Sequence, residues 1–379
     1  MNHNKKLAIV RSSPLPLNIK LYNVQEIGLA IGLAHNNIST DIFSRFDGLT
    51  KPVVCYSHDG CDVRLIPIKG LSFFNKFAFY PGLFKRIRES KYNYVQLHED
   101  SQITTPIIIN LGKKVGTKLI LYQGMYQYYT GMNRIIQILF DVVFKNSIIR
   151  NINLVIAKTN AAKKYLELKR YKNVHVLPIG LSFPSNKQLC SAKNIIDNFK
   201  SKKKHILLYI GIIEGRRNIP FIIAVLEKII KNGRCDYGLI IVGDGPQHKY
   251  IYDLIVAKDL VAHVLLIPSI PNDQLWYIYQ SSDIFLLPSQ YEIYGMVVLE
   301  ALFYGIPVIS SETAGPKDII TNDILGACLP FNINIWIYNI HAIISMESNE
   351  NKNFRFSYIK NNFDWRIIAE KYINMLASI

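Results

Sequence analysis

The chain has 379 residues, of which 49% are hydrophobic and 19% are charged, so it is too long for one ordinary domain and too apolar to be disordered. We therefore expect two domains of about 150–200 residues each. The net charge of +16 leaves three explanations open: a nucleic acid, an anionic membrane surface, or a solvated lysine-rich surface with no partner.

Short runs rich in Ile, Val and Leu alternate with amphipathic segments of helical length, which is the pattern of parallel α/β domains. The first run ends before Arg11 and is too short for a signal peptide, so it predicts a strand. In the first half, strands are expected at Leu7–Arg11, Thr40–Ser44, Tyr94–His98, Leu119–Gln123, Leu154–Lys158 and Val174–Pro178. Helices are expected between them at Tyr22–His35, Thr104–Gly116, Met132–Phe144 and Ala161–Leu168.

A polar, lysine-bearing segment from Pro184 to Lys204 is the candidate linker between the two domains. The alternation then restarts, with strands expected at Ile206–Tyr209, Leu239–Val242, Val264–Leu266, Ile284–Leu287 and Val308–Ser310. Helices are expected at Pro220–Asn232 and Met296–Tyr304. Ligands bind such sheets beyond the carboxyl ends of the strands, so a site is expected in the loops that follow strands.

The cysteines and the apolar runs indicate where the protein acts. The five cysteines are scattered and have no metal-ligand spacing, so we expect them to be reduced and mostly buried, as in a cytosolic protein. No apolar run approaches the roughly 20 residues of a membrane-spanning helix. We expect a cytoplasmic protein that is soluble or bound peripherally to the inner face of the cytoplasmic membrane.

The strongest signal for a binding site is the segment Pro288–Ala301, in which a predicted strand, a loop and a predicted helix follow one another. The backbone N–H groups of residues 294–297 would point out of the helix N-terminus and form an anion site suited to a diphosphate, which Gly295 would let approach closely. Glu300, one turn further on, could accept hydrogen bonds from vicinal hydroxyls such as those of ribose. Taken alone, Glu292 could be a helix-dipole residue and Glu300 a solvated helix position, but their spacing and setting favour a site.

Two other loops follow predicted strands. In Gly211–Asn218, Arg216 and Arg217 could hold phosphate charge, although an exposed basic turn is the equally simple reading. The loop Val242–Pro246 has two glycines that suit close backbone packing near a ligand, but such a turn is common.

These three loops, in this order and spacing, resemble those of glycosyltransferase family 4, a retaining family with the GT-B fold. Residues 283–319 are similar to that family's Glu-x7-Glu signature followed by Gly-x-Pro-Val, and residues 363–369 resemble its closing helix. The resemblance implies an α/β protein with two Rossmann-like βαβ domains facing across a cleft, and a C-terminal helix that crosses back to the N-terminal domain. The implied parts are an acceptor-binding domain over 1–184 with the helix 363–379, a linker over 185–204, and a nucleotide-sugar-binding domain over 205–362.

The resemblance also implies roles for the matching residues. Glu300 would bind the ribose hydroxyls, Glu292 the donor sugar, and Arg217 the departing diphosphate, while Pro268–Pro271 would contact the base. The implied donor-binding residues are Gly211, Arg216, Arg217, Asn218, Gly243, Ile270, Pro271, Glu292, Ile293, Tyr294, Gly295, Met296, Val297 and Glu300.

Two positions depart from the family pattern. Ile212 stands where arginine is usual, so one of two phosphate cations is missing and Arg216 is the candidate replacement. Gln123 stands where a histidine near the reacting sugar is common, and an amide can donate and accept hydrogen bonds but cannot act as a base.

The expected chemistry uses neither a metal nor a cofactor. No Asp-x-Asp pair stands at a strand end and no cluster has metal-ligand spacing, so the leaving-group charge would fall to arginine and the helix dipole. The expected catalytic residues are Glu292, Arg217, His98 and Asp100. Gln123 and Glu99 are acceptor-side candidates, but Glu99 could equally cap the helix that follows it.

The expected reaction is retaining transfer from a UDP- or GDP-sugar to a glycan or lipid-linked glycan, in the biosynthesis of an O-antigen, capsule or exopolysaccharide. Leu71–Arg88 and Met125–Arg150 interleave aromatic and basic residues, which suits docking on an anionic inner membrane, although most of these aromatics could equally be core residues. Three alternatives stay open: a nucleotide-sugar epimerase or phosphorylase of similar fold, a basic nucleic-acid-binding protein, and a non-catalytic relic. No recognised nucleic-acid motif is present, so we expect no nucleic-acid partner.

Overall fold

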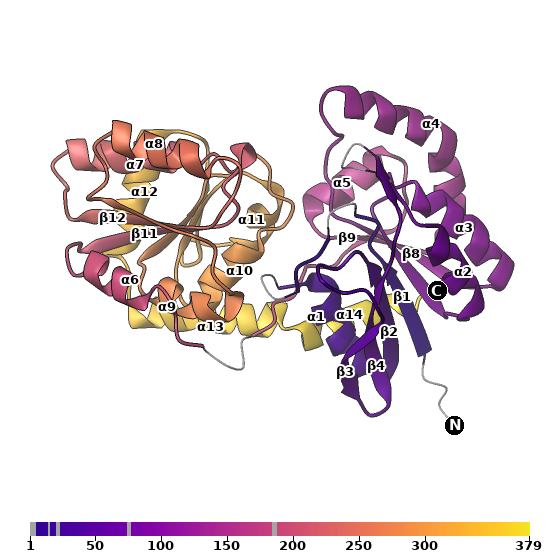
Figure 1. Cartoon of the computed structure of the whole chain (residues 1–379). Coiled ribbons are helices and arrows are strands. Elements are labelled where there is room, and N and C mark those ends of the chain that lie inside the picture. The colour runs from indigo at the N-terminus through magenta and orange to yellow at the C-terminus, as the bar shows by residue number, and fades with distance from the viewer. Residues whose placement is uncertain (1–4, 14–15, 20–22, 74–76, 184–187) are drawn as a thin grey trace. The chain divides into compact units, whose positions relative to one another are not determined.

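The structure is a computed structural model that describes residues 5–13, 16–19, 23–73, 77–183 and 188–379. The chain forms two compact units (Figure 1). Unit 1 comprises Met1–Ser182 and Phe363–Ile379, and unit 2 comprises Phe183–Asn362.

The described part of unit 1 contains an eight-stranded sheet in the order β10-β9-β8-β7-β1-β2-β4-β3, in which every neighbouring pair is parallel except β3 and β4. The strands of this sheet are β1 (Lys5–Val10), β2 (Ile38–Ser44), β3 (Val53–His58), β4 (Cys61–Pro67), β7 (Tyr94–His98), β8 (Lys118–Gln123), β9 (Leu154–Ala157) and β10 (Val174–Val176), and β5 (Leu71–Phe73) and β6 (Phe77–Phe79) form a separate pair. The helices are α1 (Gln25–Ala34), α2 (Pro81–Glu89), α3 (Thr104–Val115), α4 (Met132–Asn151), α5 (Asn160–Leu168) and α14 (Trp365–Leu376). Every residue of β7 is buried, because helices cover both faces of a parallel sheet and leave its strands as continuous apolar runs.

The end of the chain returns to unit 1 through α14, which packs against α1 (Figure 1). The contact requires glycine on α1, because a Cβ atom at Gly28 would lie 2.0 Å from the indole of Trp365. A Cβ atom at Gly32 would lie 2.5 Å from the carbonyl oxygen of Trp365. The predicted return of the C-terminal helix to the N-terminal domain is therefore confirmed.

Unit 2 contains, among its described residues, a six-stranded sheet in the order β13-β12-β11-β14-β15-β16, and all its neighbouring strands are parallel. The strands are β11 (His205–Ile210), β12 (Tyr237–Val242), β13 (Val264–Ile267), β14 (Ile284–Leu287), β15 (Val308–Ser311) and β16 (Gly326–Leu329). The helices are α6 (Lys193–Lys200), η1 (Gly215–Arg217), α7 (Ile219–Lys231), α8 (His248–Ala257), η2 (Asn272–Gln274), α9 (Leu275–Gln280), α10 (Met296–Phe303), α11 (Ala314–Ile319), α12 (Ile333–Ser345) and α13 (Asn349–Phe363). The strand order reverses between β11 and β14, so their carboxyl ends are the topological switch point at which such sheets bind ligands.

Three expectations differ from the structure. The strands β3, β4, β5, β6 and β16 were not predicted; β3 lies at an edge of the sheet with mostly exposed side chains, and β5, β6 and β16 have only three or four residues each. The expected linker over 185–204 contains α6, whose Ile196 is fully buried in unit 2; residues 185–187 lie outside the described part. The cysteines are free as expected but are not mostly buried, since Cys55 and Cys235 are exposed and Cys328 is half-buried.

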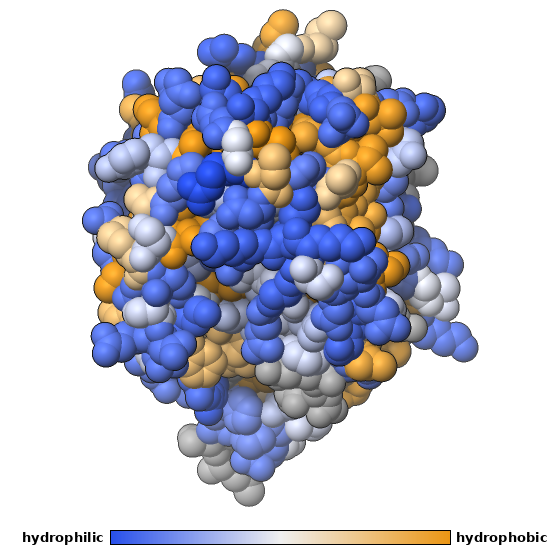
Figure 2. Space-filling model, turned by 90° about the vertical axis from the view of Figure 1, so that its left-hand side faces the viewer, coloured by the Kyte–Doolittle hydropathy of each residue, from blue (hydrophilic) through white to orange (hydrophobic). Residues whose placement is uncertain are grey.

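The surface is largely polar where Figure 2 shows it: hydrophilic residues cover most of that face, and apolar residues form separate patches. None of the helices in the described part of the chain combines the length and the hydropathy needed to cross a membrane.

Candidate functional site

The loops after β11 and β14 meet at the switch point of unit 2. The backbone N–H of Gln290 donates to the carbonyl of Arg216 at 2.8 Å, and the Arg216 guanidinium donates to the carbonyl of Tyr291 at 3.1 Å. Arg216 also pairs with Glu214 at 2.7 Å and keeps 41% of its side chain exposed. The two loops that the sequence singled out are therefore held against one another by direct hydrogen bonds.

Arg217 and Glu292 form an ion pair between these two loops, and the same Nη1 atom of Arg217 lies 3.3 Å from the Ser289 hydroxyl. Both side chains are largely buried, with 15% and 11% exposed. The Nε atom of Arg217 is buried without a hydrogen-bond partner among the described residues, and the Glu214 carboxylate is 3.9 Å away from it. A buried guanidinium with a spare donor at a strand end is suited to binding an anion.

The N-terminus of α10 follows directly. Its N-cap residue is Gly295, whose φ of 86° lies in the left-handed region that favours glycine. No side chain of the described residues caps this helix, so the first backbone N–H groups, those of Met296 and Val297 among them, point outward as donors. The helix dipole adds partial positive charge at the same place.

Glu300 lies one turn into α10 and is 7% exposed, so the alternative of a solvated helix position is wrong. It accepts a hydrogen bond from the Tyr279 hydroxyl at 2.9 Å and one from the Asn272 amide at 3.2 Å. Burial is the larger cause that raises the pKa of Tyr279, and the charge of the Glu300 carboxylate is the next. The Tyr279 phenol therefore stays protonated and donates the hydrogen bond. Asn272 follows Ile270 and Pro271 directly, which places the segment predicted to contact the base beside Glu300.

Tyr279 and Asn272 were not found by sequence reasoning. Neither belongs to a motif, and the pattern around α9 indicates only an amphipathic helix. The Tyr279 ring stacks on Tyr304 with centroids 5.2 Å apart, which fixes the direction in which its hydroxyl points.

Gly211 and Gly243 pack the loops after β11 and β12 backbone to backbone. A Cβ atom at Gly243 would lie 2.0 Å from the carbonyl oxygen of Gly211, and its φ is 149°. The Asp244 carboxylate accepts from the Ser269 N–H at 2.9 Å and from its hydroxyl at 2.7 Å, and these bonds lower the pKa of Asp244. The loops after β11, β12, β13 and β14 are thus connected by direct contacts, and Gly243 provides the close packing between two of them.

In unit 1, His98 and Glu99 stand at the end of β7. His98 is buried, with Nδ1 3.4 Å from Glu26 and Nε2 2.9 Å from the Gln96 amide, and burial lowers its pKa well below the ordinary value. Glu99 accepts from the N–H groups of Gly124 at 3.0 Å and Met125 at 3.2 Å, and burial raises its pKa. The alternative that Glu99 caps the following helix is wrong, since its side chain instead orders the loop after β8.

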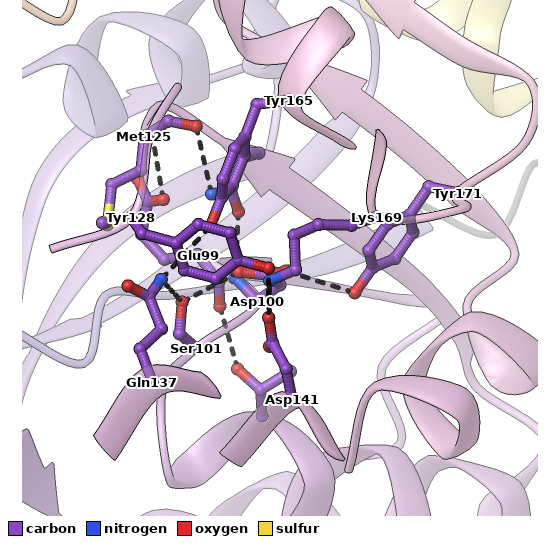
Figure 3. A network of polar contacts seen from close by, with 12 residues as sticks. Glu99, Asp100, Ser101, Met125, Tyr128, Gln137, Asp141, Tyr165, Lys169 and Tyr171 are labelled. Atoms are coloured by element: carbon purple, nitrogen blue, oxygen red, sulfur yellow. Dashed lines mark hydrogen bonds and ion pairs between the residues drawn. The ribbon is translucent and has the colours of Figure 1, made fainter. Parts of the chain in front are cut away.

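Asp100 and Gln123 lie in the core of unit 1. Asp100 is 1% exposed and pairs with Lys169, which also binds Asp141 at 2.9 Å (Figure 3). The side chain of Gln123 is fully buried and accepts the Asp100 N–H at 2.9 Å. Both side chains are therefore engaged within unit 1, because a desolvated carboxylate needs its ammonium partner and a buried amide needs its hydrogen bonds.

Figure 3 shows the Lys169 side chain between the carboxylates of Asp100 and Asp141, with tyrosine side chains around it. Its ammonium lies 5.6 Å from the ring centre of Tyr128 and 5.3 Å from that of Tyr165. In the described residues, no three His, Cys, Asp or Glu side chains are grouped as metal ligands would be.

Comparison with known proteins adds family information to this geometry. The family model described as glycosyl transferases group 1 matches residues 191–363. An uncharacterized glycosyltransferase of Methanocaldococcus jannaschii is 28% identical over 45% of this chain and 44% of its own length. The amylovoran biosynthesis glycosyltransferase AmsD of Erwinia amylovora is 26% identical over 59% of this chain and 61% of its own.

The matched part of this chain thus spans about half the length of these two relatives. Among solved structures, Anabaena HepE in complex with UDP covers 99% of this chain and 100% of its own at a TM-score of 0.71, with 13% identity. This similarity is one of fold. The chain has the GT-B fold, and its residues 191–363 are similar to the glycosyl transferases of group 1.

Proposed function

We propose that the chain is a retaining glycosyltransferase that moves a sugar from a nucleotide-diphosphate donor to a glycan or lipid-linked glycan. The observation that carries this proposal is the row of groups at the switch point of unit 2. The Arg217–Glu292 pair, the uncapped start of α10 and Glu300 follow one another along a single loop–helix segment and its neighbour. A donor consists of sugar, diphosphate and nucleoside in the same order.

Each part of the donor has a chemically suited partner in this row. The diphosphate would accept hydrogen bonds from the N–H groups at the start of α10 and from Arg217. Glu292 would accept from sugar hydroxyls, and the buried Glu300 carboxylate from the ribose hydroxyls. The UDP complex of Anabaena HepE, which has the same fold, supports a nucleotide-linked donor, and we propose UDP or GDP as its nucleotide.

The resemblance to glycosyltransferase family 4 implies retention of the anomeric configuration, and we propose that retention arises by a front-face displacement. The acceptor hydroxyl oxygen forms the new bond to the anomeric carbon while the bond from that carbon to the diphosphate breaks. The departing diphosphate takes the hydroxyl proton. Arg217 and the dipole of α10 stabilise the charge that develops on the diphosphate, which is why we propose a reaction independent of metal.

We propose a role in surface polysaccharide biosynthesis at the inner face of the cytoplasmic membrane, with unit 1 binding the acceptor. The resemblance to AmsD supports this proposal, since AmsD is a glycosyltransferase of amylovoran biosynthesis. The aromatic and basic residues of Met125–Arg150 are consistent with it. The side chains of residues 71–78 in the other such stretch, Leu71–Arg88, lie outside what the structure describes.

A thermal-shift titration with UDP, GDP and their sugars tests the donor site. We expect one nucleotide to raise the unfolding temperature of the chain, and Glu300→Ala to abolish that increase. Glu312→Ala, an exposed glutamate of unit 2 that pairs with Lys317, is the matched control. If no nucleotide diphosphate shifts the transition, or if Glu300→Ala keeps the full shift, the assigned site is wrong.

A further inference from the structure

The helix α4 turns polar residues toward the interior of unit 1 and apolar residues toward the surface, the reverse of an ordinary surface helix. All twenty of its residues are described, and its buried positions are Gln137, Asp141 and Ile148. Five of its apolar residues are between 57% and 74% exposed: Met132, Ile135, Leu139, Val142 and Val143. A helix of a water-soluble domain normally turns its apolar stripe inward.

The spacing shows that these exposed residues form one face. Positions three and four apart lie on the same side of a helix, so Met132, Ile135, Leu139 and Val142 form a continuous stripe, which Ile136 and Val143 widen. Gln137 and Asp141 are four apart and lie on the opposite side. The apolar stripe therefore runs along the outward side of α4 over about three turns.

Hydrogen bonds hold α4 in this orientation. The Gln137 amide donates to the Ser101 hydroxyl at 2.9 Å and to the Tyr165 hydroxyl at 3.2 Å. Asp141 accepts from Lys169 at 2.9 Å and from Tyr128 at 3.1 Å (Figure 3). A rotation that buried the apolar stripe would break all four bonds and leave a buried ammonium short of a partner. The fold itself keeps the stripe on the surface.

The charges around the stripe are cationic. Asp141 is the single acidic residue of α4 and is buried, whereas Arg134 and Arg150 are exposed and Lys145 is half-exposed. On the same side of the sheet, α3 packs against α4 and also against α2, which carries the exposed cations Lys85, Arg86 and Arg88. The whole chain carries a net charge of +16.

These charges select among possible occupants of the stripe. A second copy of the chain, related by a twofold axis, would bring cation to cation around an apolar contact. An anionic bilayer offers acyl chains to the stripe and negative headgroups to its cationic border, which is the pattern of helices that lie in a membrane interface.

We propose that α4 lies in the interface of an anionic lipid bilayer, with its stripe against the acyl chains and Arg134, Lys145 and Arg150 at the headgroups. The inference rests on the proposed function, which places the acceptor at the membrane. It adds that α4 makes the membrane contact, and which side of α4 faces the lipid. On its inward side, α4 is connected to the loop after β7 that carries Glu99, because Gln137 is bonded to Ser101 in that loop.

Co-sedimentation with vesicles of phosphatidylethanolamine and phosphatidylglycerol in equal parts, and with vesicles of phosphatidylcholine alone, tests the proposal. We expect the full chain to bind the anionic vesicles, and to bind them at least about tenfold more weakly when salt rises from about 0.05 M to about 0.5 M. The double variant Leu139→Glu/Val142→Glu should bind at least about tenfold more weakly than the parent at low salt. The matched control Leu189→Glu/Val261→Glu places the same two changes on exposed residues of unit 2 and should bind like the parent.

Since the substituted side chains are exposed, both double variants should unfold at the temperature of the parent, and their nucleotide-induced shift should be unchanged. Failure of the parent chain to bind anionic vesicles at low salt, or equal binding by the α4 variant, overturns the inference. So does a dimer of the parent in sedimentation equilibrium that the α4 variant loses, because the stripe would then be covered by a second copy. Vesicle binding without any nucleotide shift would support the inference and count against the proposed donor site.

Discussion

Arg217 and Glu292 pair with one another across 75 residues of sequence, from the loop after β11 to the loop that precedes α10. Sequence reasoning gave them separate ligands, phosphate for Arg217 and sugar for Glu292. The pairing means that each charge is held in place by the other before a donor arrives. A donor would then enter a site whose charged groups are already ordered, which lowers the cost of organising them in the transition state.

Removing either member of this pair should reduce turnover more than donor affinity. We expect Arg217→Ala to lower kcat by about 10²–10³, since one preorganised donor to developing negative charge is lost. Glu292→Ala should lower kcat while the Kd of the free nucleotide changes little, because its proposed partner is the sugar. Steady-state kinetics and nucleotide titration separate the two effects, and Arg234→Ala, an exposed arginine of unit 2, is the control. Full activity in both site variants would remove these residues from the mechanism.

The Glu300 carboxylate should depend on Tyr279 for its position. Tyr279→Phe removes one hydroxyl from a stacked, buried ring, so we expect nucleotide affinity to fall by about tenfold or more, the worth of one hydrogen bond to a charged group. Tyr250→Phe, on an exposed tyrosine of the same unit, should change nothing. Calorimetric titration with the nucleotide measures both. An unchanged affinity in Tyr279→Phe would show that this hydroxyl does not position Glu300.

The buried triad of Lys169, Asp100 and Asp141 should carry much of the stability of unit 1. Lys169→Met leaves two buried carboxylates without their cation, and breaking such a group costs about 3–5 kcal/mol. Lys163→Met breaks the exposed i,i+4 pair with Glu167 and should cost less than about 0.5 kcal/mol. Denaturant unfolding of both variants gives the comparison. Equal stabilities would mean that the triad is dispensable for folding.

His98 should make the stability of the chain fall in mild acid. Burial lowers its pKa in the folded state below that of the unfolded chain, so the unfolded state binds the proton more readily. Stability is therefore retained above the unfolded value near pH 6.5 and is lost as the pH falls below it, by at most about 1.4 kcal/mol per pH unit.

His98→Asn should flatten this dependence, whereas His175→Asn, on an exposed histidine, should leave it as in the parent. Unfolding midpoints at about pH 7 and about pH 5.5 would show the difference. A parent chain whose stability does not change over that interval would contradict the buried, neutral state of His98.

Much of the sheet framework could be predicted from the sequence. The expected bounds of Tyr94–His98 and Ile284–Leu287 coincide with β7 and β14, because central parallel strands are continuous apolar runs. The edge strand β3 was not predicted, and its side chains are mostly exposed rather than buried as in a central strand. The inverted helix α4 was expected as a helix, but periodicity cannot tell which side of a helix faces the core when the inward side is polar.

The proposed donor loops and the alternation of strands and helices could therefore be predicted from the order of the residues, since apolar runs, glycines and helix starts act over a few neighbouring positions. The partners of the charged residues were not, because those contacts join residues far apart in the chain. Glu300 meets Tyr279 and Asn272, and Asp100 meets Lys169, through the packing of separate elements. That packing buried the side chains of Asp100 and Gln123 and left the apolar stripe of α4 exposed, and no local pattern could have shown either result.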